Sequence, residues 1–130
     1  MGPRYLIDSN IIIDYSAGVL PSHASDFCEQ IFNSNFIIST VVKIEVLGYN
    51  HIPDKLVLMT EFINSATVLP LNEDVVQQTI LLRRKYRKIK LGDAIIAATA
   101  IIHKLTLVTR NTVDFENIKG LSFINPWNNL

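Results

Sequence analysis

Four acidic residues occur beside apolar segments, where an ionised carboxylate is costly to bury without a partner. Asp8 follows the strand-like segment YLI, Glu45 lies within KIEVL, Asp93 begins the segment DAIIAATA, and Asp114 follows LVT in the segment LVTRNTVDF. Crowded carboxylates repel one another, so a site that keeps them ionised needs a cation. Ligand sets made only of oxygen favour Mg²⁺ or Mn²⁺. The first prediction is therefore a divalent metal site.

Three of these acids also have an ordinary structural explanation. Asp93 could simply cap a helix, Glu45 could be an exposed helix residue paired with Lys43 or a distant cation, and Asp114 could form a turn with Asn111. Asp8 is harder to explain in this way, because an acid at a strand end has few structural roles. The four together favour a site more strongly than any one of them.

The hydrophobic pattern predicts an α/β domain, because short continuous apolar runs alternate with segments of helical periodicity. Continuous rather than alternating apolar runs indicate strands of a parallel sheet that is buried on both faces. Four or five strands are expected, at 4–8, 36–39, 66–69, 106–109 and 121–124. Helices flank them at 9–16, 22–34, 40–47, 53–64, from 73 onward, and 93–103, with N-caps at Ser9, at Ser39 or Thr40, and at Asn72.

This chain order predicts that the acids meet at one edge of the sheet. Ligands of open α/β sheets gather at the carboxyl ends of the strands. Asp8 and Asp114 follow strands directly, and Glu45 lies in the helix that follows the second strand. Asp93 joins them if its helix begins at that edge.

Composition is typical of a single globular domain, predicted here to span residues 1–130. Apolar residues make up 48% of the chain, and no apolar run approaches the roughly 18 residues that would span a bilayer. No signal peptide is recognised, and the single cysteine, Cys28, excludes an internal disulfide. We therefore expect a cytoplasmic protein without membrane contact. The scattered histidines His23, His51 and His103 do not support a zinc site.

The net charge is zero, but half of the twelve cationic residues lie in one segment, RRKYRKIK at 83–90. This segment could bind RNA, with cations on phosphates and an aromatic ring on an unpaired base. The equally weighted alternative is a solvated helix end whose cations favour the helix dipole. Together with an arginine close to Asp114, the candidate RNA contacts are Arg83, Arg84, Tyr86, Arg87, Lys90 and Arg110.

Four motifs together resemble the PIN-domain ribonucleases, and most of all the VapC-type toxins of toxin–antitoxin pairs. They are LIDSN at 6–10, STVVKIEVLGY at 39–49, KLGDAIIAATA at 90–100 and LVTRNTVDFENI at 107–118. The resemblance implies a PIN-like fold and an Mg²⁺- or Mn²⁺-dependent endoribonuclease whose catalytic carboxylates are Asp8, Glu45, Asp93 and Asp114. Gly92 stands where many such sequences have proline, which should affect helix entry more than chemistry.

The resemblance also suggests how the site is divided. Three aspartates, Asp8, Asp93 and Asp114, are candidates for direct metal ligands, and Glu45 is expected to act through a coordinated water or a second ion. Neighbouring polar groups would orient carboxylates or waters, and these are Ser9, Asn10 and Asn111.

A homodimer and a cognate antitoxin protein are implied as partners, beside RNA. Apolar residues on two predicted helices offer surface for such an interface: Phe27, Ile31, Phe32, Leu56, Val57, Met59 and Phe62.

Other classes fit less well. A haloacid-dehalogenase-type phosphatase needs a second acid two residues after the first, where Asn10 stands, and a Rossmann domain needs a glycine-rich first turn, which DSNII lacks. A non-catalytic PIN-fold module for RNA binding or assembly remains the alternative.

Overall fold

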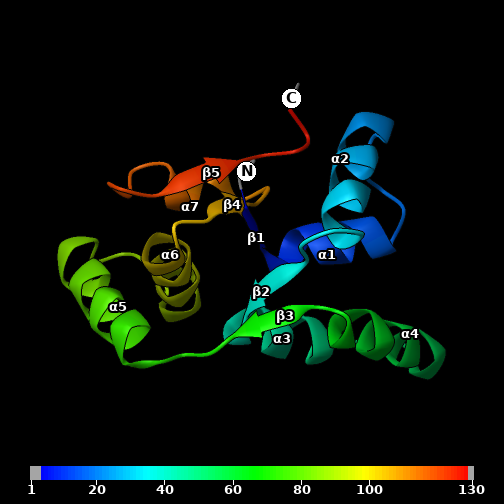
Figure 1. Cartoon of the computed structure of the whole chain (residues 1–130), viewed down its shortest axis with the longest axis horizontal. Helices are drawn as coiled ribbons and strands as arrows, with labels where there is room; N and C mark the ends of the chain where they lie inside the picture. Colours follow the sequence, from blue (N-terminus) through cyan, green and yellow to red (C-terminus); the bar gives the residue numbers. More distant parts are fainter. Residues whose placement is uncertain (1–3, 129–130) are drawn as a thin grey trace.

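The computed structural model describes residues 4–128, which form five short strands and seven helices (Figure 1). The strands are β1 (Tyr5–Ile7), β2 (Ile37–Ser39), β3 (Thr67–Leu69), β4 (Thr106–Val108) and β5 (Ser122–Ile124). The helices are α1 (Ser9–Ser16), α2 (Ser22–Phe32), α3 (Thr40–Leu47), α4 (Pro53–Asn64), α5 (Glu73–Lys85), α6 (Leu91–His103) and α7 (Thr112–Phe115).

All strand pairs are parallel, as predicted. Hydrogen bonds join β1, β4 and β5 in that spatial order, with Leu6 opposite Leu107 and Leu107 opposite Phe123. A second ladder joins β2 to β3, with Ile38 opposite Val68. Strands β1 and β2 lie close together, although the two ladders remain separate (Figure 1). The expected sheet of four to five parallel strands is thus confirmed, with a break between its two parts.

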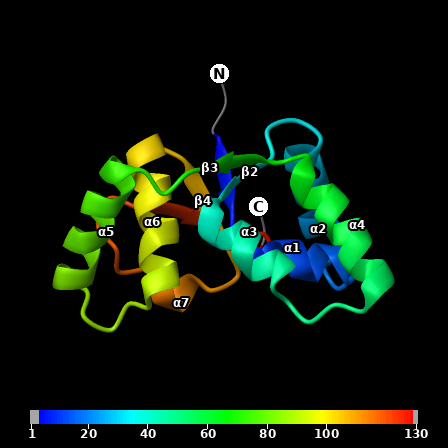
Figure 2. The same cartoon turned by 90° about the horizontal axis from the view of Figure 1, so that it is seen from below.

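The helices form two groups around the strands (Figure 2). Helices α5 and α6 pack against each other, whereas α1, α2 and α4 lie together on the other side, and α3 lies between the groups and contacts α1, α4 and α6. Because α3 contacts both groups, residues on its exposed face can reach α1 and the beginning of α6.

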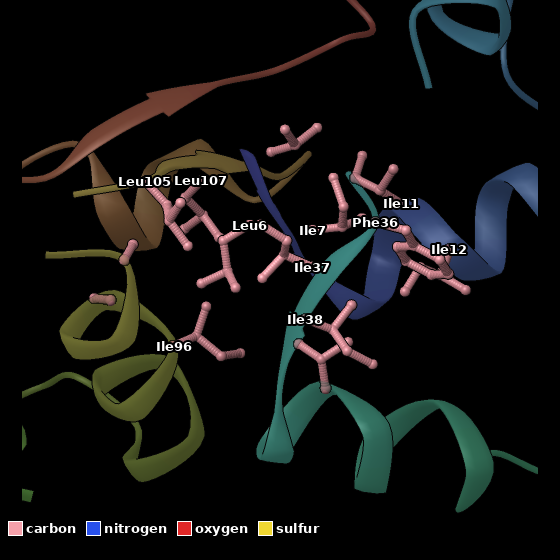
Figure 3. Packing of buried hydrophobic residues seen from close by; sticks show 14 of the residues in the cluster. Leu6, Ile7, Ile11, Ile12, Phe36, Ile37, Ile38, Ile96, Leu105 and Leu107 are labelled. Atoms are coloured by element: carbon pink, nitrogen blue, oxygen red, sulfur yellow. The ribbon is translucent and has the colours of Figure 1, made fainter. Parts of the chain in front are cut away.

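The core explains why the short strands are continuous apolar runs. Leu6, Ile7, Ile38 and Leu107 have no exposed surface, and helix residues such as Ile96 pack against them (Figure 3). Burying a side chain of this kind contributes about 1.5–3 kcal/mol relative to leaving it exposed. Strands β1, β2 and β4 are therefore held by burial on both faces, which suits a parallel sheet, whereas β3 and β5 are only partly buried.

Most of the apolar surface expected on α2 and α4 is used internally. Phe32 of α2 packs on Phe62 of α4 and on Phe36, with ring centroids 4.9 Å apart in both pairs. Ile31 and Met59 are buried, whereas Leu56 and Val57 remain exposed. Phe27 of α2 is half-buried, so the exposed apolar surface lies mainly on α4, and the interface stays a prediction.

Helix starts differ from the predictions at α1 and α6. Asp8, not Ser9, is the N-cap of α1, because its carboxylate accepts a hydrogen bond from the Ser9 amide. Helix α6 begins at Leu91, two residues earlier than expected. At α3 the structure decides between the two predicted caps. Ser39 caps the helix, and the Thr40 hydroxyl instead donates to the carbonyl of Leu69, which lies 29 residues further along the chain.

Other features agree with the pattern or are not visible in it. Asn72 caps α5 as predicted, with its side chain accepting from the amide of Val75. The short helix α7, which carries Asp114, is not predicted by the pattern, because four residues are too few to show a helical period. Within residues 4–128, the helices are all too short or too polar to cross a membrane.

Candidate active site

Asp8 is a buried carboxylate at the carboxyl end of β1, with 4% of its surface exposed. One carboxylate oxygen accepts from the Ser9 amide at 2.8 Å. The other accepts from the Thr109 hydroxyl at 2.8 Å and from the side-chain amide of Asn10 at 3.3 Å. Burial raises the pKa of Asp8, and these donors, led by Thr109, lower it only in part. Asp8 thus does have a structural role, as a helix cap, in addition to any chemistry.

Thr109 is a central polar residue that the sequence pattern does not reveal. It is fully buried, and its hydroxyl donates to Asp8 while accepting from the Asn111 amide at 3.0 Å. The signal lies in the topology, since Thr109 follows β4 as Asp8 follows β1, and paired parallel strands place those positions side by side. Interpreting TLVT only as an apolar strand hides this role.

Asn10 and Arg110 connect α1 to the loop after β4. The side-chain oxygen of Asn10 accepts from the Arg110 amide at 3.1 Å. The Arg110 guanidinium forms an ion pair at 2.7 Å with Asp14, a buried acid of α1 that was not among the predicted site residues. Backbone and side chain of Arg110 are therefore both fixed by α1.

Glu45 projects from the exposed side of α3 toward α1 and α6. Partial desolvation raises the pKa of its carboxyl, a hydrogen bond from the Ser9 side chain lowers it, and the charges of Asp8 and Asp93 raise it further. A Cβ added to Gly92 would lie 3.9 Å from a Glu45 carboxylate oxygen, an ordinary contact distance. This distance places Glu45 at the first turn of α6.

Asp93 occupies the third position of α6, where Lys90 is the N-cap residue and forms no side-chain capping bond. Desolvation raises the pKa of Asp93, the charges of Asp8 and Asp114 raise it further, and Lys90 lowers it. Asp114 lies exposed on α7, where the Asn111 side-chain amide donates to it at 2.6 Å. The contact between Asn111 and Asp114 is thus a side-chain hydrogen bond at the start of α7 rather than the predicted turn.

Neighbouring acidic charges raise the pKa values of Glu45 and Asp93, and Lys90 offsets this for Asp93 only in part and without forming an ion pair. Across residues 4–128 no lysine, arginine or histidine forms an ion pair with Asp8, Glu45, Asp93 or Asp114. Nor, in that part of the chain, do three acidic, histidine or cysteine side chains come close enough together to form a metal cage. Mg²⁺ commonly keeps several waters and is held by one or two carboxylates, so an all-oxygen set of this kind fits a hydrated ion rather than an enclosed one.

Two grooves border the acids. The first, of about 400 Å³, is bounded by Asp93 and Asp114 and by the chain that connects α5 to α6; its other lining residues are Tyr86, Arg87, Lys88, Ile89, Lys90, Val113, Asn117 and Ile118. We call it the basic groove. The second, also of about 400 Å³, is lined by Ser9, Asn10, Ile13, Asp14, Glu45, Tyr49 and Arg110. We call it the tyrosine groove.

The structure separates the six candidate RNA contacts into two sets. Arg83 donates to the carbonyl of Ile89 at 2.6 Å, and the Tyr86 hydroxyl accepts from the Lys119 amide at 2.9 Å, so both brace the fold. Arg110 is paired with Asp14, as described above. The three remaining candidates, Arg84, Arg87 and Lys90, make no such side-chain contact to the described residues. Of these, Arg87 and Lys90 line the basic groove, whereas Arg84 lies outside it. Lys88 also lines this groove, although it was not a predicted contact.

Comparison with known proteins gives the class of this chain. A model of the PIN domain family matches residues 5–121, which is most of the chain. The chain belongs to the PIN domain family.

Within that family the chain is similar to VapC proteins. It is 28% identical over 125 residues to Ribonuclease VapC1 of Rickettsia felis, covering 92% of this chain and 93% of the relative. A toxin–antitoxin complex from Klebsiella pneumoniae has a chain with 29% identity and a TM-score of 0.77, covering 94% of this chain and 97% of its own. DNA-bound VapBC from Salmonella typhimurium matches with 24% identity and a TM-score of 0.79, covering 98% and 100%.

The Thr109 hydroxyl should stabilise the folded protein through Asp8. Replacing Thr109 with Val keeps its shape but removes a donor to a buried carboxylate, which should lower the free energy of unfolding by about 1–3 kcal/mol. Thr109→Ser keeps the hydroxyl and should lose less. Urea unfolding in EDTA at neutral pH measures both, and equal stability of wild type and Thr109→Val would contradict this role.

Asp93→Asn should stabilise the metal-free protein at neutral pH. Because the pKa of Asp93 is raised in the folded state, the folded chain binds this proton more readily than the unfolded chain, and stability falls as the pH rises through that raised pKa. Asn removes this cost, which we expect to exceed the roughly 0.3–1 kcal/mol that an acid gains at a helix N-terminus. The advantage of Asn should shrink toward pH 4, where wild type is protonated.

Asp74→Asn is the matched control, since Asp74 lies exposed in the first turn of α5 and lines neither groove. It should be slightly destabilising at neutral pH, because an acid in the first turn favours the helix dipole. Thermal melts of all three proteins in EDTA from pH 4 to pH 8 decide the matter. A lower melting temperature for Asp93→Asn at neutral pH would show that the carboxylate supports the fold.

Proposed function

We propose that this chain is an Mg²⁺- or Mn²⁺-dependent endoribonuclease and the toxin of a toxin–antitoxin pair. The observation that carries the proposal is the group of acids near the carboxyl edge of the strands. Burial disfavours the ionisation of Asp8, Glu45 and Asp93, and neighbouring acidic charges add to this for Glu45 and Asp93. No cation among residues 4–128 forms an ion pair with any of the four acids. Arrangements that cost stability in this way are typical of functional sites. The likeness to a protein named Ribonuclease VapC1 supports the choice of RNA as substrate.

In this proposal Asp8, Asp93 and Asp114 would hold the ion directly, which requires these side chains to move closer together than they stand in this structure. Glu45 would act through water or a second ion. When bound, the ion lowers the pKa of a coordinated water and neutralises charge on the phosphoryl group. Ser9, Asn10, Asn111 and Thr109 fix the carboxylates through the hydrogen bonds described above. Asp114 is exposed and can turn from Asn111 without disturbing the core.

The basic groove is proposed to bind the RNA backbone beside the acids. Helix α5 ends at Lys85, so Arg87, Lys88 and Lys90 lie on the connection that leads directly into α6 and Asp93. Cations at this position offset the repulsion between the acids and phosphate. A chain of zero net charge can in this way attract RNA locally.

The remaining partners are also proposals. Similar solved structures are complexes of a toxin with its antitoxin, which supports a cognate antitoxin for this chain. A homodimer and a cytoplasmic location remain predictions. For the dimer, exposed apolar side chains offer contact surface on α4, at Leu56, Val57 and Leu58, and near the α5–α6 pair, at Ile80, Leu81 and Leu91.

Metal-dependent cleavage is tested by replacing Asp8 with Asn. The variant keeps a hydrogen-bonding side chain but loses a ligand charge, so cleavage of a fluorescent unpaired RNA in millimolar Mg²⁺ or Mn²⁺ should fall well beyond the roughly 10–100-fold typical of outer-shell groups. Wild type in excess EDTA should be equally inactive. Asp26→Asn, on the exposed side of α2, should cleave like wild type. Full cleavage by Asp8→Asn, or in EDTA, would refute the proposal, and binding by wild type without cleavage under any metal would favour the non-catalytic module.

Backbone binding in the basic groove predicts a change in salt dependence. In the Asp8→Asn background, Arg87→Ala or Lys90→Ala should weaken RNA binding and reduce the slope of log Kobs against log salt by about 0.7 for each phosphate that is no longer neutralised. Arg4→Ala removes the same charge at the opposite edge of the strands and should leave the slope unchanged. Fluorescence anisotropy over a salt series measures all three variants. An unaltered slope for Arg87→Ala and Lys90→Ala would show that the cations of the connection between α5 and α6 are solvated and do not contact RNA phosphates.

A further inference from the structure

Tyr49 is an exposed aromatic residue beside the acids that the proposed mechanism does not use. It follows α3, has 55% of its surface exposed, and lines the tyrosine groove together with Glu45, Asn10 and Arg110. An exposed tyrosine in a polar groove offers a flat apolar face that water solvates poorly.

The Tyr49 ring packs against the imidazole ring of His51. A ring nitrogen of His51 donates to the carbonyl of Val46 at 2.9 Å, which fixes the imidazole at the end of α3. The Tyr49 and His51 ring centroids are 5.1 Å apart with planes inclined by 51°. The His51 amide also donates to the carbonyl of Tyr49 at 2.9 Å, which closes the turn between them. A ring positioned before the ligand arrives loses little entropy on binding.

The charges of the tyrosine groove differ from those of the basic groove. Among its lining residues the single cation, Arg110, is already paired with Asp14, and Glu45 adds a further negative charge. Electrostatic attraction for phosphate is therefore weak here. Contact with the apolar face of Tyr49 is therefore the stronger source of affinity that this groove offers.

The two grooves meet at the acids from different directions. They share no lining residue, since Asp93 and Asp114 bound one groove and Ser9 and Glu45 bound the other. The grooves adjoin at the first turn of α6, where a Glu45 carboxylate oxygen lies 3.9 Å from the position of a Cβ added to Gly92, next to Asp93. A strand whose backbone lies in the basic groove would therefore enter the tyrosine groove once it has passed the acids.

We infer that Tyr49 is a stacking platform for one unpaired base of the RNA, on the opposite side of the acids from the basic groove. This inference rests on the proposed function and deepens it. Base pairing and stacking within a duplex would hide the base faces, so the platform selects a single-stranded segment. The exposed part of the Arg110 guanidinium lies at the same groove and can donate to the phosphate or to the base edge.

The test uses binding, separately from cleavage, in the Asp8→Asn background with EDTA. Tyr49→Leu removes the aromatic ring but keeps an apolar side chain, and should weaken binding of a short unpaired RNA by roughly 5- to 100-fold, the range for one base–aromatic stack. The salt slope should stay unchanged, because the substitution removes no cation from the phosphates. Tyr49→Phe should bind like the background protein. Ile52→Ala, at an exposed residue three positions later that does not line the groove, is the control.

Position along the RNA is measured with 2-aminopurine placed at one nucleotide at a time. Its fluorescence should be quenched by stacking at a single position, and Tyr49→Leu should abolish that quenching while Ile52→Ala should not. Equal affinity and quenching in Tyr49→Leu, with RNA still bound, would overturn the inference but leave the proposed function intact. Absence of RNA binding by every protein, including the background, would instead count against the proposed function and with it the platform.

Discussion

The interaction on which the site depends is the burial of Asp8 at the end of β1. A carboxylate with 4% exposure is tolerable only because Ser9, Asn10 and Thr109 donate to it. Two of these donors lie at the start of α1, and the third, Thr109, directly follows β4. The hydrogen bonds to this one carboxylate therefore also join β1, α1 and β4. The same carboxylate begins α1 as its N-cap. The proposed chemistry and the fold are thus coupled at a single residue.

The other acids are placed by elements that meet around Asp8. Glu45 comes from α3, which contacts both helix groups, and Asp93 comes from the first turn of α6. Asp114 comes from α7 and is held by Asn111. Among the described residues none of the four forms an ion pair with a cation, and repulsion from neighbouring acids disfavours the ionised forms of Glu45 and Asp93. In the proposed function a divalent ion relieves this repulsion.

The surroundings of the acids are asymmetric, and the asymmetry follows from chain connectivity. The connection between α5 and α6 delivers cations to one side, because helix α5 ends at Lys85 and the chain must return to begin α6 at Leu91. The end of α3 delivers an aromatic residue to the other side, where Arg110 is neutralised by Asp14. In the proposed function, cations for the RNA phosphates and an aromatic face for a base therefore lie in different grooves.

The sequence alone determined the parallel α/β fold, most helix and strand positions and the four acids, because continuous apolar runs, helical periodicity and cap residues are local signals. Tertiary structure decided what depends on neighbours distant in the chain. Asp8 and Thr109 are 101 residues apart, and only the pairing of β1 with β4 brings the Thr109 hydroxyl within hydrogen-bond distance of the Asp8 carboxylate. Likewise, the RRKYRKIK segment presents six equal cations, whereas folding uses Arg83 to brace a turn and places Arg87, Lys88 and Lys90 in the groove beside the acids. Hydrogen bonds between remote segments leave no period in a sequence, so their partners appear only once the strands are paired.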